Sequence, residues 1–228
     1  MDITVKELYK SYGDKPVLQN FSADFKDGKV SVVMGKSGSG KTTLLNCIAG
    51  LTPFEGEVSG VKRAAYVFQQ DRLIPHMSIY GNLEITLRDS PEVKSEKIKN
   101  VLRAVDLTDK AHKLPSELSG GERKRAALSR AFLSDADVIL LDEPLNSLDV
   151  GLKRRIDDYF LEMIKNDKKS AIYVTHDLDE ALFIADEITV IIGGKPAYVH
   201  AFSSTALNRD ITSDECVKVR RELLRLLY

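Results

Sequence analysis

The stretch Lys29–Gly50, KVSVVMGKSGSGKTTLLNCIAG, decides the fold. Its first part, 29–34, is nearly all apolar, which is typical of a strand buried on both faces of a parallel sheet. Its last part, 41–50, has the pattern of a helix with apolar residues. The turn between them, Gly35–Thr42, carries the spacing G-x-x-x-x-G-K-[ST]. The stretch therefore predicts an α/β fold of the P-loop NTPase type, with a phosphate-binding loop where a buried strand ends.

The chemistry of this loop favours a nucleoside triphosphate with Mg²⁺. Glycines let backbone N–H groups crowd round an anion, and the start of the following helix adds its dipole. Lys41 can reach the β- and γ-phosphates, and Thr42 can ligate Mg²⁺. The residues expected to contact the nucleotide are Gly35, Lys36, Ser37, Gly38, Ser39, Gly40, Lys41, Thr42 and Thr43. The pattern does not choose among the many classes of P-loop protein.

Two adjacent carboxylates follow a second apolar run, DVILLDEP at 137–144. Asp142 would sit at the end of a buried strand, the usual place for a carboxylate that holds Mg²⁺. Glu143 could point elsewhere and orient and deprotonate an attacking water. The alternative is an ordinary acidic turn before Pro144, and the phosphate loop makes the catalytic interpretation the better one.

Strand and helix patterns alternate along most of the chain. Strands are expected over 3–8, 17–25, 29–34, 64–68, 137–142, 170–175, 186–192 and 196–201. Helices are expected over 41–50, 92–105, 121–133, 150–166, 178–184 and 214–227. Strand signals vanish between 72 and 136, which predicts a helical subdomain inserted into an α/β core of residues 1–71 and 137–228. We expect one domain over 1–228.

Composition excludes several classes of function. The net charge of −1 provides no basic field for nucleic acid, and charge runs such as 122–125 are typical of solvated helix faces. Cys47 and Cys216 follow no metal spacing and favour a reducing compartment. No signal peptide is expected at the N-terminus, and no apolar run approaches the roughly 20 residues that span a bilayer. A membrane role would therefore need a partner.

A second glycine turn, LSGGE at 118–122, has two interpretations. Ser119 followed three residues later by Glu122 forms a capping box that opens a helix. Gly120 and Gly121 weaken the first turn of that helix, so something would have to approach their backbone closely. Both interpretations can hold together, because a capped helix start is itself an anion site.

The order of these motifs resembles the ABC-type ATPases over nearly the whole chain. LSGGE, between the phosphate loop and VILLDEP, resembles their signature sequence. YVFQQDRLIP at 66–75 resembles their Q-loop with Gln69, NSLD at 146–149 their D-loop with Asp149, and VTHDLDEAL at 174–182 their H-loop with His176. Tyr12 matches the aromatic residue that stacks on adenine. The resemblance implies ATP and Mg²⁺ as cofactors and an ATPase activity.

The resemblance also implies a role for each motif. Two subunits would pair head to tail, so that Ser119, Gly120 and Gly121 bind the γ-phosphate held by the partner, a homodimer being expected. Gln69 would contact Mg²⁺ or the attacking water, and His176 the γ-phosphate. Neighbouring Gln70 and Tyr9 are the alternatives to Gln69 and Tyr12. The remaining histidines, His76, His112 and His200, match no motif.

Some features distinguish this chain within the resembled family. The segment from Gly56 to Tyr66 is shorter than usual, so we expect a trimmed antiparallel β subdomain. The separate ATPase chain and DEPLNSLD at 142–149 look like bacterial importers, nearest to the nitrate, sulfonate and taurine group. We expect permease subunits and a solute-binding protein as partners, and a cytoplasmic location on the inner face of the membrane. The alternative is a soluble ABC ATPase of a non-transport complex, such as cofactor assembly or cell division.

The apolar residues after Gln69 leave two interpretations open. Leu73, Ile74, Met77, Ile79 and Tyr80 could fill the core of the helical subdomain. They could instead line an exposed groove where a short helix of the permease docks, as the resemblance implies. The transported solute would be recognised by subunits other than this one.

Overall fold

The chain folds around two β-sheets in a computed structural model that describes residues 1–146 and 148–228. A six-stranded sheet has the order β5-β6-β7-β3-β8-β9, in which all strands except β9 run parallel. A smaller antiparallel sheet has the order β2-β1-β4. The strands of the larger sheet are β3 (Val30–Met34), β5 (Ala64–Val67), β6 (Val138–Asp142), β7 (Ser170–Val174), β8 (Glu187–Ile192) and β9 (Lys195–Ala201). Those of the smaller sheet are β1 (Ile3–Tyr12), β2 (Lys15–Phe25) and β4 (Glu55–Ser59).

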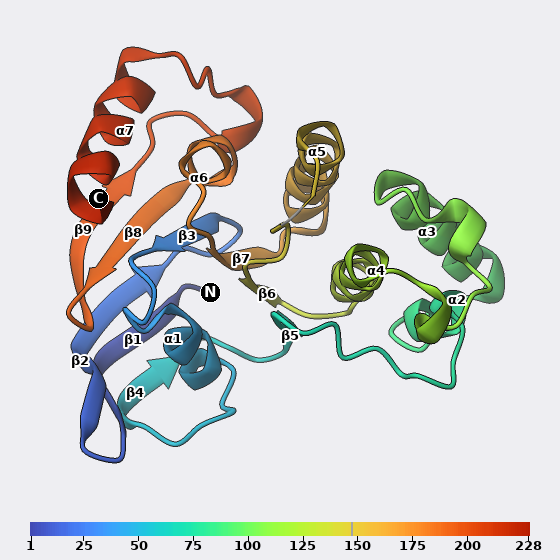
Figure 1. Ribbon diagram of the computed structural model, residues 1–228, viewed down its shortest axis with the longest axis horizontal. Coiled ribbons are helices and arrows are strands. Elements are labelled where there is room, and N and C mark those ends of the chain that lie inside the picture. Colours follow the sequence, from blue (N-terminus) through green and yellow to red (C-terminus); the bar gives the residue numbers. More distant parts are fainter. Residues whose placement is uncertain (147) are drawn as a thin grey trace.

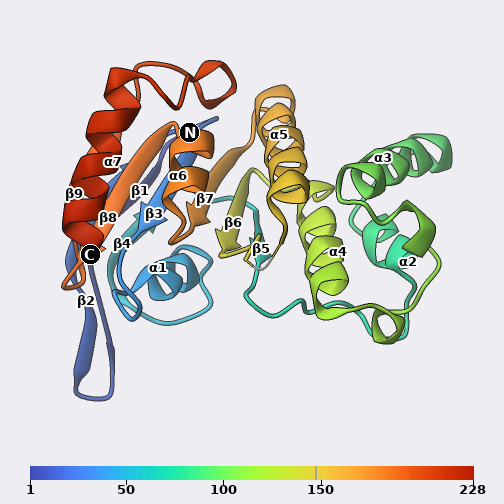
Figure 2. The same ribbon diagram turned by 45° about the horizontal axis from the view of Figure 1, so that its top comes forward.

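Helices cover both faces of the larger sheet and extend to one side of it (Figure 1). They are α1 (Lys41–Ile48), α2 (Ile79–Glu84), α3 (Pro91–Ala104), α4 (Gly120–Phe132), α5 (Val150–Asp167), α6 (Leu178–Ile184) and α7 (Asp214–Leu227). Figure 2 shows α4 and α5 between the sheet and the pair α2 and α3. The elements from 72 to 136 are all helical, as the sequence predicts.

Side chains alternate between two cores along the central strands. On β3, Val32 joins the core shared with α4, α5 and α6, whereas Val33 joins the core shared with α1 and the smaller sheet. Every residue of β3, β6 and β7 is buried, which confirms the prediction of strands covered on both faces. Cys47 and Cys216 are both buried and free.

One strand, β4, and one α-helix, α2, are not predicted from the sequence. Strand β4 pairs with β1, and helix α2 follows the irregular stretch after Gln69. In that stretch Leu73 and Ile79 are buried in the main core, which favours packing over docking for these two positions. Ile74 is half-buried. Of the helices that the structure describes, none has the length and apolar character needed to cross a membrane.

Candidate functional site

The glycine-rich turn connects β3 to α1 and wraps round the start of that helix. Gly40 occupies the helix N-cap with φ 106°, a left-handed conformation that suits glycine. A side chain at Gly35 would lie 2.5 Å from Ser39 Oγ and 2.7 Å from the carbonyl oxygen of Ile191. This chain's own packing therefore requires glycine at both positions.

Lys41 crosses beneath the loop that it follows. Its Nζ donates hydrogen bonds to the carbonyl oxygens of Gly35 and Lys36, at 2.7 Å and 3.0 Å. Burial lowers the pKa of Lys41, and the negative charges of Glu143 and Asp142 act in the opposite direction. The loop thus holds a buried cation at the centre of its curve, suited to an anion with several negative charges.

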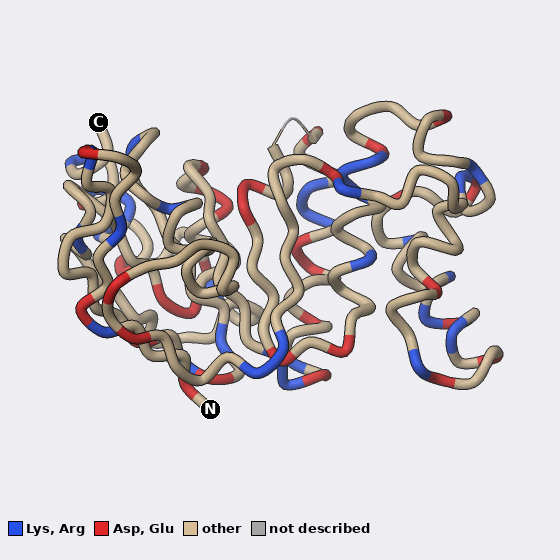
Figure 3. The backbone as a smooth tube through the Cα atoms, turned by 90° about the horizontal axis from the view of Figure 1, so that it is seen from below, with Lys and Arg blue, Asp and Glu red and all other residues tan. Residues whose placement is uncertain are grey.

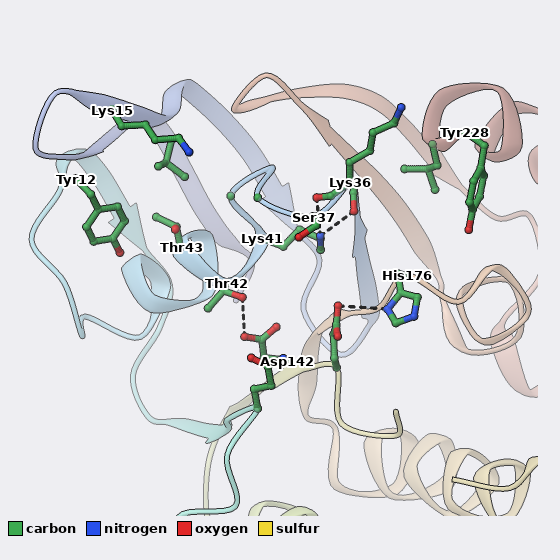
Figure 4. Close-up of a pocket in the computed structure, with 17 residues that line it drawn as sticks. Tyr12, Lys15, Lys36, Ser37, Lys41, Thr42, Thr43, Asp142, His176 and Tyr228 are labelled. Carbon is green, nitrogen blue, oxygen red and sulfur yellow. Dashed lines mark hydrogen bonds and ion pairs between the residues drawn. The ribbon is translucent and has the colours of Figure 1, made fainter. Parts of the chain in front are cut away.

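Asp142 ends β6 directly opposite the first turn of α1. Its Oδ2 accepts a hydrogen bond of 2.8 Å from Thr42 Oγ1 (Figure 4). Burial raises the pKa of Asp142, the hydrogen bond from Thr42 lowers it, and the charge of Glu143 raises it. A hydroxyl and a carboxylate side by side are hard oxygen ligands, the kind that Mg²⁺ prefers. The pair therefore fits Mg²⁺ by its chemistry.

Glu143 turns away from Asp142 because its backbone is left-handed, with φ 49°. Its N–H donates to the carbonyl oxygen of Val174 at 3.0 Å, which fixes this turn against β7. Its Oε1 lies 3.3 Å from His176 Nδ1, and its Oε2 accepts a hydrogen bond of 2.5 Å from Asn146 Nδ2. The two adjacent carboxylates thus have separate partners, as their places at the strand end predict.

These groups line one cavity of about 870 Å³. Of the residues expected at the nucleotide, it is lined by Tyr12, Gly35, Lys36, Ser37, Gly38, Gly40, Lys41, Thr42, Thr43, Gln69, Asp142, Glu143 and His176. Ser39 does not line it, and Ser39 Oγ is buried without a hydrogen-bond partner among the described residues. The alternatives Tyr9 and Gln70 do not line it either, which favours Tyr12 and Gln69.

Sequence reasoning missed several residues of this cavity. Lys15, Val17, Leu227 and Tyr228 also line it, and Figure 4 shows Tyr12 and Tyr228 on opposite sides of the phosphate loop. Leu227 and Tyr228 arrive from the far end of the chain, so no local pattern reveals them. Asn146, which holds Glu143, was missed as well, although its spacing of three residues after Glu143 in a turn is a usable signal.

The second glycine turn does not reach this cavity. Ser119 caps α4, its Oγ accepting from Glu122 N at 3.3 Å while Glu122 Oε2 accepts from Ser119 N at 2.7 Å. Gly120 and Gly121 line a separate cavity of about 640 Å³, which Gln69 also lines. The capping box is confirmed.

Asp149 likewise lies outside the cavity at the phosphate loop. It is the N-cap of α5, where its Oδ1 accepts from Leu152 N at 3.0 Å. Ser147 of the NSLD motif falls outside the described residues.

The chain is similar to known proteins over nearly its whole length. The ABC transporter family matches residues 18–146 of the chain. The aliphatic sulfonates import ATP-binding protein SsuB 1 of Paracoccus denitrificans is 36% identical over 228 residues, covering 99% of this chain and 93% of that protein. The Fe(3+) ions import ATP-binding protein FbpC 2 of Haemophilus influenzae is 35% identical over 212 residues, 85% of this chain and 60% of its own length.

Solved structures show the same architecture. The dimeric post-hydrolysis state of the ATP-binding cassette MJ0796, bound to ADP and Pi, has a TM-score of 0.79 at 28% identity. The match covers 89% of this chain and 99% of that one. A second structure, the ATP-binding subunit of an ABC transporter, has a TM-score of 0.81 at 21% identity. The predicted fold class is confirmed.

Proposed function

The chain belongs to the ABC transporter family as an ATP-binding and ATP-hydrolysing subunit, and we propose that it powers import of a small solute through a separate permease. One arrangement carries the assignment of its active site. The Thr42–Asp142 contact of 2.8 Å and the Glu143–His176 contact of 3.3 Å lie in the same cavity at the phosphate loop. Ligands for a cation and a candidate base thus face one substrate position.

The phosphate loop and the end of β6 opposite it would bind the nucleotide and its Mg²⁺. The backbone N–H groups of the loop and the ammonium of Lys41 would hold the β- and γ-phosphates, and Tyr12 would stack on the adenine. Thr42, Asp142 and Gln69 would hold Mg²⁺. When bound, Mg²⁺ neutralises negative charge on the β- and γ-phosphate oxygens. Gln69 is exposed at the rim, so it can join the site when the nucleotide is present.

Hydrolysis would depend on Glu143 as the general base. Its carboxylate would accept a proton from the attacking water, and Asn146 Nδ2 and His176 Nδ1 hold its two oxygens in place. His176 is 61% exposed, so its imidazole remains free to contact the γ-phosphate as well.

A second copy of the chain would complete the site. Ser119, Gly120, Gly121 and Asp149 do not line the cavity of their own phosphate loop, yet a side chain added at Gly120 or Gly121 would meet no atom of the chain too closely. The nearest atoms to an added side chain would be 3.8 Å away at Gly120 and 4.0 Å away at Gly121. The packing of this chain does not require glycine there, which supports approach of a partner's nucleotide.

The remaining partners follow from the class of transporter. The relatives named above are import proteins for different solutes, aliphatic sulfonates and Fe(3+) ions, at nearly equal identity to this chain. We therefore propose that permease subunits and a solute-binding protein select the solute, and that the chain works on the cytoplasmic face of the membrane. The import names favour this function over a non-transport complex. Lys and Arg are interspersed with Asp and Glu along the part of the chain that the structure describes (Figure 3), and the net charge is −1.

Residues 72–136 would form a helical subdomain that meets the permease, beside a core of residues 1–71 and 137–228. Helices α2, α3 and α4 contact one another and lie to one side of the sheet (Figure 1).

Replacement of Glu143 tests the assignment. We expect Glu143→Gln to bind ATP within about threefold of the wild type and to lose about 10²- to 10⁴-fold in turnover, the usual cost of removing a general base. Glu96→Gln, an exposed acid-to-amide change on α3, serves as the matched control and should hydrolyse ATP normally. Turnover of Glu143→Gln within a few-fold of the wild type would remove Glu143 from this role.

A further inference from the structure

A cluster of charged and polar side chains, some buried and some partly buried, lies beneath His176. It joins α5, the end of β7 and the first turn of α6, three elements that are consecutive in the chain. Its members are Lys153, Tyr173, Thr175, Asp177 and Glu180. None of them lines the cavity at the phosphate loop.

Glu180 is the centre of the cluster and is almost fully buried, at 5% exposure. Its Oε1 accepts a hydrogen bond of 2.8 Å from Tyr173 and lies 3.3 Å from Lys153 Nζ. Its Oε2 accepts a hydrogen bond from the hydroxyl of Thr175. A buried carboxylate is tolerated only when it is paired and hydrogen-bonded, and such a group admits little movement of its partners.

The same cluster holds the backbone on both sides of His176. Thr175 Oγ1, which donates to Glu180, also accepts a hydrogen bond of 3.1 Å from the N–H of Asp177. Asp177 caps α6 by accepting from the N–H groups of Asp179 and Glu180, at 2.9 Å and 3.2 Å. Residues 175 and 177 are therefore both fixed, with His176 between them.

Lys153 connects this segment to α5. Its Nζ is 2.7 Å from Asp177 Oδ2 and 3.3 Å from Glu180 Oε1, and its side chain is only 18% exposed. Helix α5 begins one turn earlier, at its N-cap Asp149. Lys153 thus ties the helix that follows the NSLD motif to the segment that carries His176.

Few contacts restrain the imidazole of His176. Its side chain is mostly exposed, and its polar contact among the described residues is the one with Glu143 at 3.3 Å. We propose that Lys153, Thr175 and Glu180 are positioning residues that fix the backbone of His176, and so the place of its imidazole relative to Glu143. This inference rests on the proposed ATPase site, and it adds residues that the cavity itself does not reveal.

Two isosteric changes test this role without emptying the core. Thr175→Val keeps the shape and the strand preference of the side chain but removes the hydroxyl that bridges Glu180 and Asp177. Lys153→Met keeps the length of the side chain but removes its charge. We expect each to lower kcat about 10- to 100-fold with KM for ATP within about threefold, because small displacements of a catalytic group have effects of this size. The conservative variants Thr175→Ser and Lys153→Arg keep the hydroxyl and the charge, respectively, and we expect each to retain most of the wild-type kcat.

Controls separate positioning from loss of folding. Lys165→Met, an exposed change on the same helix, should behave as the wild type. Thermal unfolding and ATP binding measured on every variant give the fraction of folded protein by which kcat is divided. If Lys153→Met fails to fold, the kcat of Thr175→Val alone tests the positioning role. A folded Thr175→Val with wild-type kcat overturns the inference, as does a kcat that falls only in proportion to the folded fraction.

The proposed function can fail separately. Glu143→Gln is measured in the same series. If it is inactive and Thr175→Val is fully active, the positioning role fails and the active site stands. If Glu143→Gln retains turnover, the active-site assignment itself fails.

Discussion

Asp157 on α5 gives the sharpest prediction about stability. It is 3% exposed, and its Oδ1 has no hydrogen-bond partner among the described residues. Burial raises the pKa of Asp157 from 3.8 to about 8, and the charge of Glu180 adds to the rise. Lys153 and Arg154 act against the rise, and Asp158 adds slightly to it. At neutral pH the folded chain therefore holds this carboxyl in its protonated form.

The buried carboxyl of Asp157 makes the free energy of unfolding depend on pH. The folded state binds the proton more tightly than the unfolded chain, so raising the pH from 3.8 toward 8 lowers the free energy of unfolding. One pKa unit corresponds to about 1.4 kcal/mol, so the contribution at pH 7 amounts to about 4 kcal/mol of lost stability. Asp157→Asn cannot ionise and keeps nearly the same shape. Its free energy of unfolding should therefore rise relative to the wild type with increasing pH.

Urea unfolding at a series of pH values measures this difference. Between pH 5.5 and 7.5 we expect the advantage of Asp157→Asn in free energy of unfolding to grow by about 3 kcal/mol, and to level off above pH 8. Asp158→Asn, at the neighbouring exposed position, should stay within about 0.5 kcal/mol of the wild type at every pH. A difference between Asp157→Asn and the wild type that is flat from pH 5.5 to 9 would refute the reasoning, whatever its constant value.

The other predictions concern assembly and packing. With hydrolysis blocked by Glu143→Gln, ATP should convert the chain to a dimer in light scattering, and adding Ser119→Arg should abolish that shift because a bulky cation would occupy the proposed contact with the partner's phosphate. Leu73→Asp should lower the free energy of unfolding by more than about 3 kcal/mol in urea titrations, because Leu73 is buried in the main core. Ile85→Asp, at a position 54% exposed in the same helical region, should change stability by less than about 1 kcal/mol; equal effects of these two substitutions would contradict the core assignment of Leu73.

Local chemistry explains which parts the sequence predicts well. The phosphate loop is predictable because Gly35, Lys41 and their contacts lie within a few residues of one another. The buried strands β3, β6 and β7 are predictable because a short apolar run that ends in polar residues is typical of a strand covered on both faces. The separation of Asp142 from Glu143 also follows from their adjacent places at a strand end.

The elements that were missed depend on contacts that are distant or unusual. Strand β4, with the sequence EGEVS, has no apolar alternation, and it is a strand because β1 offers it an edge. Helix α2 contains Gly81 and has only six residues, so its own preferences are weak. It is held by Asn82, which is fully buried and donates to the carbonyl oxygens of Ile74, Met77 and Ser78, each at 3.1 Å. Such a side chain looks like an ordinary polar residue in the sequence.

The contacts within the cluster round Glu180 could not be predicted from the sequence either. Lys153 and Glu180 are 27 residues apart, and their contact exists only because α5 packs against the segment that carries α6. A buried ion pair is visible from sequence only when the packing of both elements is known. The consequence is that residues lining the cavity at the phosphate loop are predictable from sequence, whereas the contacts of the cluster behind them are not.

The two glycine turns differ in a way that bears on why one chain carries both. At Gly35 and Gly40 an added side chain would collide with atoms of the same chain, 2.5 Å and 2.9 Å away, so the fold of one copy accounts for these glycines. At Gly120 and Gly121 the nearest atoms of the chain lie 3.8 Å and 4.0 Å away, and glycine there weakens the start of α4. Because no contact within the chain explains these destabilising glycines, we infer that a contact with another molecule requires them. A nucleotide held by the phosphate loop of a second copy, as proposed above, would meet that requirement, because its charged oxygens need close approach to the backbone N–H groups of a helix start.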